Sequence, residues 1–307
     1  MLHPIGFSIP HEKLVTTFPV KTKLLSSIIP NERRKYIYED ENEYYNEYKQ
    51  SFFALTTKKN GWDCMRHYEI LANGCIPYFP DISECPKNTM TLFPKDLIIE
   101  GNQLFATFQT KIIGGLTVDD MNEYINLSQR LYSHTVNYLT TRAMARYVLE
   151  KSNHPNAKKI LFISGDPRPD YLRCNVLHGF KELLGPNCHD VPVISHIYKL
   201  DQSIDYRFIF GYKNFKELYG RGMSYTGLLD ASYHNQELDS TVKENIVTKY
   251  YDIIIYGNLH RDMIFYDIIS ELYKPNEIIL LCGEDIHTCE YSKWVDKGHT
   301  VFLREFE

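Results

Sequence analysis

The segment YDIIIYGNLHRD (residues 251–262) is a strand-length run of apolar residues that ends in a polar loop. Two other segments have the same form: KILFIS (159–164) is followed by GDPRPD (165–170), and EIILLCG (277–283) is followed by GEDIH (283–287). Strands that are apolar along their whole length are typical of parallel sheets with helices on both faces. The three segments therefore predict an open α/β sheet over the second half of the chain.

The polar loops after these strands contain Asp, His and Arg side chains. In an open α/β sheet, ligands bind outside the carboxyl ends of the strands, where such loops converge. We therefore expect these side chains to line one crevice, and the cluster favours a functional site. Any single acid could instead cap a helix, which is a common role of Asp at a helix N-terminus.

The rest of the chain divides into two further parts. Up to about residue 100, shorter strand-like runs alternate with helical segments. The segment 117–152 opens with Thr117, has acids in its first turn and contains no Pro or Gly, so it predicts one long helix or two joined helices. The linker NHPNAKK follows. The predicted parts are a domain over 1–116, a helical bridge over 117–152 and a second domain over 153–307.

Composition excludes several classes of protein. The 307 residues are 43% hydrophobic and 24% charged, as in a globular protein large enough for two cores. The net charge of −5 disfavours nucleic acid as a partner. No apolar run approaches the roughly 20 residues of a spanning helix, and no secretory signal is evident, so we expect a cytoplasmic protein without a transmembrane segment.

Motifs for common cofactors are also missing from the sequence. Neither G-x-G-x-x-G nor G-x-x-x-x-G-K-[ST] occurs, so a nicotinamide enzyme or a P-loop kinase would need an atypical site. The seven cysteines are scattered without the spacing of a zinc ribbon, which favours free thiols and no bound metal. The alternative metal ligands are Cys64 and His67, which could share a helix face.

A candidate binding motif lies in the first half, in RHYEILANGCIPYF (66–79). Arg66 and Glu69 are three residues apart and share one face of a predicted helix. A carboxylate there can accept two hydroxyl hydrogens from a ribose, while a neighbouring cation neutralises a diphosphate. Gly74 permits a tight turn before the next strand. Spacing alone favours the simpler alternative, an intrahelical ion pair between Arg66 and Glu69.

This motif resembles the donor site of exostosin-like glycosyltransferases of the GT-B fold, in which a glutamate before a Gly and Pro turn holds the ribose of a nucleotide sugar. The wider region 44–90 is similar to bacterial and viral proteins of this type from surface-glycan gene clusters. Residues 161–185 and the ending VFLREF resemble the other half of those proteins. The order of the two halves is reversed here, so the chain is expected to be a circular permutation with 117–152 as the new bridge.

The resemblance implies two Rossmann-like domains that face a central crevice. It implies metal-independent transfer of a hexosyl or pentosyl group from a nucleotide diphosphate sugar to a glycan or another hydroxyl acceptor. Glu69 would bind the ribose, as a mainly exposed carboxylate whose removal would leave the chain folded, and Gly74 would make room for the nucleotide. The candidates for the diphosphate are Arg66, Lys58, Lys59 and Lys23.

Transfer with inversion also needs a base on the opposite side of the crevice, whereas transfer with retention needs none. The candidates are Asp166, Asp170, His260 and Asp285. Asp166 is the first choice, because Gly165 beside it allows a ligand to approach closely. Two other hypotheses remain open: a nucleotide-sugar epimerase or hydrolase, and a non-catalytic nucleotide-sugar-binding protein.

Overall fold

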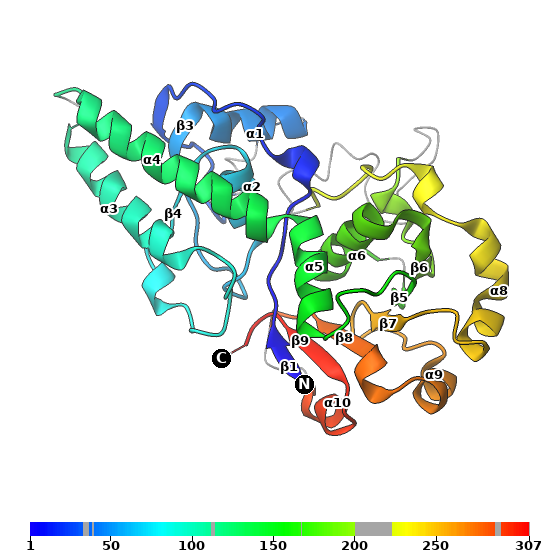
Figure 1. The fold of residues 1–307 in the computed structure, drawn as a ribbon. Coiled ribbons are helices and arrows are strands. Elements are labelled where there is room, and N and C mark those ends of the chain that lie inside the picture. The colour runs from blue at the N-terminus through cyan, green and yellow to red at the C-terminus, as the bar shows by residue number, and fades with distance from the viewer. Residues whose placement is uncertain are drawn as a thin grey trace.

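The protein contains two separate parallel sheets (Figure 1). The computed structural model describes residues 1–32, 37–38, 40–111, 114–166, 168–199, 223–285 and 290–306. The larger sheet has six strands, in the spatial order β1 (Leu2–Pro4), β9 (Thr300–Leu303), β8 (Ile278–Cys282), β7 (Ile253–Tyr256), β5 (Ile160–Ile163) and β6 (Cys188–Val191). The smaller sheet has the order β2 (Lys23–Leu25), β3 (Ser51–Leu55) and β4 (Ile76–Tyr78). All neighbouring strands are parallel, so the predicted α/β class is confirmed.

Helices flank both sheets. The α-helices are α1 (Glu41–Gln50), α2 (Met65–Ala72), α3 (Lys95–Lys111), α4 (Val118–His134), α5 (Thr141–Lys151), α6 (Tyr171–Leu184), α8 (Gln236–Val247), α9 (Tyr266–Leu272) and α10 (Ser292–Asp296). Helices α1 to α4 lie on the side of the three-stranded sheet, and α5, α6, α8 and α9 lie around the six-stranded sheet (Figure 1). None of the described helices is both long and apolar enough to cross a membrane.

The central strands of the larger sheet are buried along their whole length. Every residue of β5, β7, β8 and β9 is buried, and successive side chains enter cores on opposite faces. Phe162 packs on one face, whereas Leu161 packs on the other with residues of α8 and α9. The prediction of wholly buried strands within 159–164, 251–257 and 277–283 is therefore confirmed.

The strand order places two of the polar loops side by side. Strand β5 pairs with β6 on one side and with β7 on the other, so the sheet grows in opposite directions from this point. In open α/β sheets such a switch point leaves a crevice outside the carboxyl ends of the strands. The loops that follow β5 and β7 leave the sheet there.

The helical segment between the sheets consists of two joined helices. Helix α4 begins with a capping box in which Thr117 and Asp120 bond each other's backbone amides. A π-helical turn at Thr135–Leu139 separates α4 from α5. Helix α4 packs on α3, and α5 packs on α6, so the segment contacts both parts of the molecule.

The N-terminal strand belongs to the larger sheet, because β1 pairs in parallel with β9. The first residues of the predicted domain 1–116 therefore run beside the last strand of the predicted domain 153–307. One apolar core also extends through both parts, since Phe53 of β3 and Phe302 of β9 belong to the same cluster. The proposed boundaries at 116 and 152, and the circular permutation, stay predictions.

The crossing of α5 and α6 depends on the absence of a side chain at residue 179. A Cβ atom on Gly179 would lie 2.0 Å from the carbonyl oxygen of Thr141, a backbone atom that cannot turn aside. We expect Gly179→Ala to force the helices apart and to lower the free energy of unfolding by about 1–3 kcal/mol or more, as overpacked cores do.

Urea denaturation of the variant measures this loss. Gly114→Ala is the matched control, because a Cβ there would meet its nearest atom only at 3.9 Å. Equal urea concentrations at the unfolding midpoints of the two variants would contradict the tight packing of α5 on α6.

Candidate functional site

The loops after β5 and β7 converge at the switch point. An Asp166 carboxylate oxygen lies 2.9 Å from Nη1 of Arg261, and Nη2 of the same arginine lies 3.8 Å from Asp170. Gly165 has a φ of +76°, and a Cβ there would lie 2.4 Å from Cβ of Arg261. The close approach expected at Gly165 is therefore made by the arginine of the neighbouring loop.

Asp166 is held by arginines on several sides. Its carboxylate accepts hydrogen bonds from Arg168 and Arg261, and Arg173 lies at 4.0 Å. Burial acts to raise the pKa of this carboxyl, but the hydrogen bonds from Arg168 and the charges of Arg261 and Arg173 lower the pKa to about 2. A carboxylate with so low a pKa is a weak proton acceptor, so the geometry does not favour Asp166 as the general base.

The other three candidates differ in their surroundings. Asp170 caps α6 by accepting a hydrogen bond from the amide of Arg173 at 3.1 Å, as the capping alternative predicts. Asp285 is bound by a guanidinium nitrogen of Arg304. His260 is exposed, and its Nε2 atom faces the Cys282 thiol at 3.7 Å. Of the four, His260 is the one whose side chain forms no hydrogen bond or ion pair with a described arginine.

Arg173, which the sequence analysis did not identify, supports the loop after β5. Its side chain is fully buried, and its guanidinium donates to the backbone oxygens of Ser164, Asp166 and Arg168. In the sequence, a charged residue inside the segment that forms α6 gives no sign of this role, because the acceptors are carbonyl groups of the preceding loop. Arg173 thus fixes the loop that carries Asp166, and its charge also lowers the pKa of that carboxyl.

A second buried arginine joins the two sheets. Arg304 follows β9 directly and donates from Nε to the Gly283 oxygen at 2.9 Å and from Nη1 to the Asp63 oxygen at 2.8 Å. Nη1 also lies 2.7 Å from the Glu305 carboxylate, which accepts the amides of Trp62 and Asp63, both at 3.1 Å. The end of β9 is thereby bonded to the loop that leads into α2.

The side chain of Asp63 completes this joint. Its carboxylate accepts the amide of Phe7 at 2.6 Å and the hydroxyl of Tyr68 at 2.8 Å. Burial raises the pKa of Asp63 to about 6, although the charge of Arg304 opposes the shift. The carboxyl ends of the two sheets therefore meet at a buried polar cluster, and α2 starts beside it.

Glu69 lies inside the protein, on the second turn of α2. Its side chain is 2% exposed, so the expectation of a mainly exposed carboxylate is wrong. Tyr44 donates to Oε2 and Ser224 donates to Oε1, each at 3.0 Å. Burial raises the pKa of Glu69 to about 7; the two hydroxyls act in the opposite direction, and the nearby charge of Arg66 does so more weakly. Sequence spacing identified the residue but not its burial, because Ser224 is remote in the chain.

The other predicted donor-site residues do not all gather around Glu69. Arg66 is half-buried on the first turn of α2. Lys58 and Lys59 are exposed on the loop before the helix, and Lys58 Nζ lies 4.8 Å above the Trp62 ring. Lys23 pairs with Glu47 at 2.6 Å. Its positive charge is therefore already balanced within the protein.

Gly74 has a structural reason to be glycine. Its φ is +62°, a conformation that L side chains rarely adopt. A Cβ atom there would lie 3.2 Å from Cδ of Pro19 and close to Phe18. The space beside Gly74 is thus occupied by the segment that precedes β2, and a nucleotide would have to displace that segment to use it.

Two groups of side chains could be considered for a metal. The first is the predicted pair of Cys64 and His67. His67 bonds Thr56 through Nδ1 at 2.8 Å and the Trp62 oxygen through Nε2 at 2.9 Å, so both ring nitrogens already have partners. In the described part of the chain, Glu12, His178 and Glu182 form one further group of potential ligands.

This second group lacks the usual support of a metal site. Nδ1 of His178 lies 3.0 Å from the Thr141 hydroxyl and 3.6 Å from Glu182. Its buried Nε2 atom has no partner among the described residues, whereas metal-bound histidines normally donate their second N–H to an acceptor. We assign no metal or cofactor to either group.

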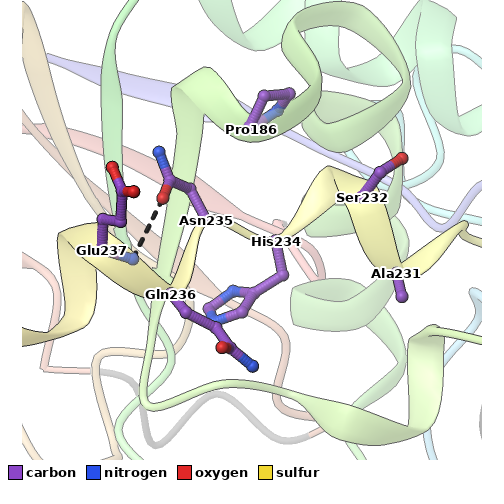
Figure 2. Close-up of a pocket in the computed structure, with 7 residues that line it drawn as sticks. All are labelled: Pro186, Ala231, Ser232, His234, Asn235, Gln236 and Glu237. Atoms are coloured by element: carbon purple, nitrogen blue, oxygen red, sulfur yellow. Dashed lines mark hydrogen bonds between the residues drawn. The ribbon is translucent and has the colours of Figure 1, made fainter.

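A shallow surface hollow lies away from these loops, at the start of α8 (Figure 2). Asn235 caps the helix by accepting the Glu237 amide at 3.0 Å. His234 lies 3.3 Å from Asp190 and 2.9 Å from Asp239, so both of its ring nitrogens face carboxylates. These side chains connect α8 to β6, and the hollow is not a candidate for the active site.

The joint at Arg304 can be tested by substitution. Arg304→Met removes the guanidinium and leaves the buried Glu305 without its cation, so we expect a loss of about 3–5 kcal/mol in the free energy of unfolding. Chemical denaturation followed by tryptophan fluorescence measures the loss. The control is Arg168→Met at a side chain that is 71% exposed, for which we expect a change below about 1 kcal/mol. Similar losses in the two variants would refute the central role of Arg304.

The raised pKa of Glu69 predicts a particular pH dependence. Its folded-state pKa of about 7 exceeds the ordinary glutamate value of 4.5, so the stability that it contributes is present below about pH 4.5 and is lost as pH rises through 7. Between pH 5 and pH 8 we expect the free energy of unfolding of Glu69→Gln to rise by about 1–3 kcal/mol relative to that of the native protein. Urea denaturation across that pH range measures the change. The exposed control Glu123→Gln should show no such trend with pH. If the difference in the free energy of unfolding between Glu69→Gln and the native protein stayed constant over this pH range, the buried carboxyl would be contradicted.

Comparison with known proteins identifies no relative of this chain. No known protein family matches it, and no curated protein or solved structure is significantly similar to it.

Proposed function

We propose that this protein is a glycosyltransferase of the GT-B type, which moves a sugar from a nucleotide diphosphate sugar to a glycan or another hydroxyl acceptor. The observation that carries the proposal is the position of Glu69. A buried carboxylate lies on the helix that starts where the two sheets meet, and it binds two hydroxyl groups through its two oxygens. The 2′- and 3′-hydroxyls of a ribose present the same pair of donors.

Positive charge close to this helix fits the second part of the donor. Arg66 lies on the first turn of α2, and Lys58 and Lys59 lie on the loop before it. Cys64 is the N-terminal cap of α2, and a helix N-terminus favours anions. These groups would stabilise the charge that develops on a departing diphosphate, so the transfer would proceed without a metal.

The acceptor would bind on the side of the six-stranded sheet. In an inverting transfer, a base takes the proton of the acceptor hydroxyl while that oxygen bonds the anomeric carbon and the nucleoside diphosphate leaves. His260 suits this role best, because it is exposed at the switch point and its ring forms no hydrogen bond or ion pair with a described arginine. Asp166, with its lowered pKa, would instead orient Arg261.

One observation favours a second candidate function. The three acids proposed for catalysis are each engaged, Asp166 and Asp285 by arginines and Asp170 as a helix cap. That arrangement suits a protein that binds a nucleotide sugar without turning it over. Release of free nucleoside diphosphate from a sugar conjugate distinguishes the two functions, because only the enzyme produces it.

The test is a thermal-shift titration with UDP, GDP, CDP, dTDP and their common sugar conjugates, without added metal. We expect one nucleotide family to raise the melting temperature, since a ligand of the native state stabilises it by mass action. Glu69→Gln keeps the size of the side chain but retains only one acceptor oxygen, so we expect at least about tenfold weaker binding.

Glu123→Gln, an exposed substitution on α4, serves as the control and should bind like the native protein. If no nucleotide shifts the native protein, the glycosyltransferase proposal is wrong. If a nucleotide binds equally well to Glu69→Gln, the donor site lies elsewhere.

A further inference from the structure

Two hydroxyls of the protein itself occupy the carboxylate of Glu69. Tyr44 comes from α1, which packs beside α2. Ser224 comes from the segment 223–229, which is far away in the sequence and lies between β6 and α8. Each carboxylate oxygen therefore already has a hydroxyl donor. Glu69 is 2% exposed, so a ribose could reach these oxygens only if one of the segments that cover them moved.

Ser224 is the donor that can leave as part of a separate segment. Its own hydroxyl accepts a hydrogen bond from the Tyr45 hydroxyl at 3.0 Å, so the side chain is oriented toward Glu69. Further along the segment, the amides of Gly227 and Leu229 donate to the backbone oxygens of His196 and Ile197. The segment is thus anchored at its far end by backbone bonds and reaches Glu69 through one serine.

The docked segment leaves polar atoms unsatisfied. The hydroxyls of Tyr225 and Thr226 are buried and have no hydrogen-bond partner among the described residues. The Cys174 thiol lies near Tyr225, but sulfur is a weak acceptor. A buried hydroxyl without a partner destabilises the state that buries it. Withdrawal of residues 224–226 would return these hydroxyls to water and would remove one donor from Glu69, at the cost of exposing the buried Tyr225 ring.

We propose that the segment 223–229 competes with the nucleotide for Glu69. The Ser224 hydroxyl takes the place of one ribose hydroxyl on that carboxylate. The inference rests on the proposed function, because it assigns the nucleotide to Glu69. In the docked arrangement the site is closed, and a nucleoside diphosphate binds after the segment withdraws. The apparent dissociation constant then equals the intrinsic value divided by the fraction of molecules that are open.

This relation gives a specific expectation for the serine. Ser224→Ala removes the competing hydroxyl and leaves Glu69 and the backbone unchanged. The open fraction rises, so we expect nucleoside diphosphate binding to tighten about three- to tenfold. Ser232→Ala is the matched control, because it makes the same change in the short 3-10 helix Ala231–Tyr233, away from Glu69.

The experiment is isothermal titration of the native protein and the two variants with UDP, GDP, CDP and dTDP in turn, together with hydrogen exchange of the 223–229 amides. Tighter binding to Ser224→Ala, with faster exchange in 223–229 when the nucleotide is bound, supports the proposal. Unchanged or weaker binding to Ser224→Ala, with slower exchange on binding, overturns the competitor but leaves the donor site intact. Absence of binding to both the native protein and Ser224→Ala overturns the proposed function and the competitor together.

Discussion

The joint between the two sheets depends on the buried guanidinium of Arg304. It is fully buried, lies 4.5 Å from the Phe7 ring centre and bonds groups that follow β8 and β9 as well as the loop before α2. A buried charge is stable only while its partners surround it, and separating them is costly. The start of α2 is therefore fixed relative to the larger sheet, and with it the position of Glu69.

The joint also separates two electrostatic environments. On the α2 side, Asp63 and Glu69 are desolvated, and burial raises the pKa of the first to about 6 and of the second to about 7. At the switch point, Asp166 is surrounded by arginines and its pKa falls to about 2. Acids in the first environment can exchange a proton near neutral pH, whereas Asp166 stays ionised. An acid in the second environment therefore serves to position charge rather than to carry a proton.

The sequence predicts the strands and the helix starts better than it predicts what covers a side chain. Wholly apolar runs reveal β5, β7 and β8, because their burial shows in each strand by itself. Strand β6 was missed, since its buried His189 and Asp190 depend on Asp239 and Lys181 from other elements. The burial of Glu69 and the role of Arg304 were missed for the same reason: their partners come from distant segments, and spacing along one helix does not show them.

The surroundings of Glu69 also bear on its purpose. If it only stabilised the fold, a carboxylate would be a poor choice, because a buried ionised group loses hydration that two neutral hydroxyls replace only in part. A neutral Gln of similar size would avoid burying a charge and would still offer an acceptor to one of the two hydroxyls. Under the proposed function, the two acceptor oxygens of the carboxylate also serve the ribose of a nucleotide. One of their present donors belongs to a segment that buries two hydroxyls without hydrogen-bond partners among the described residues.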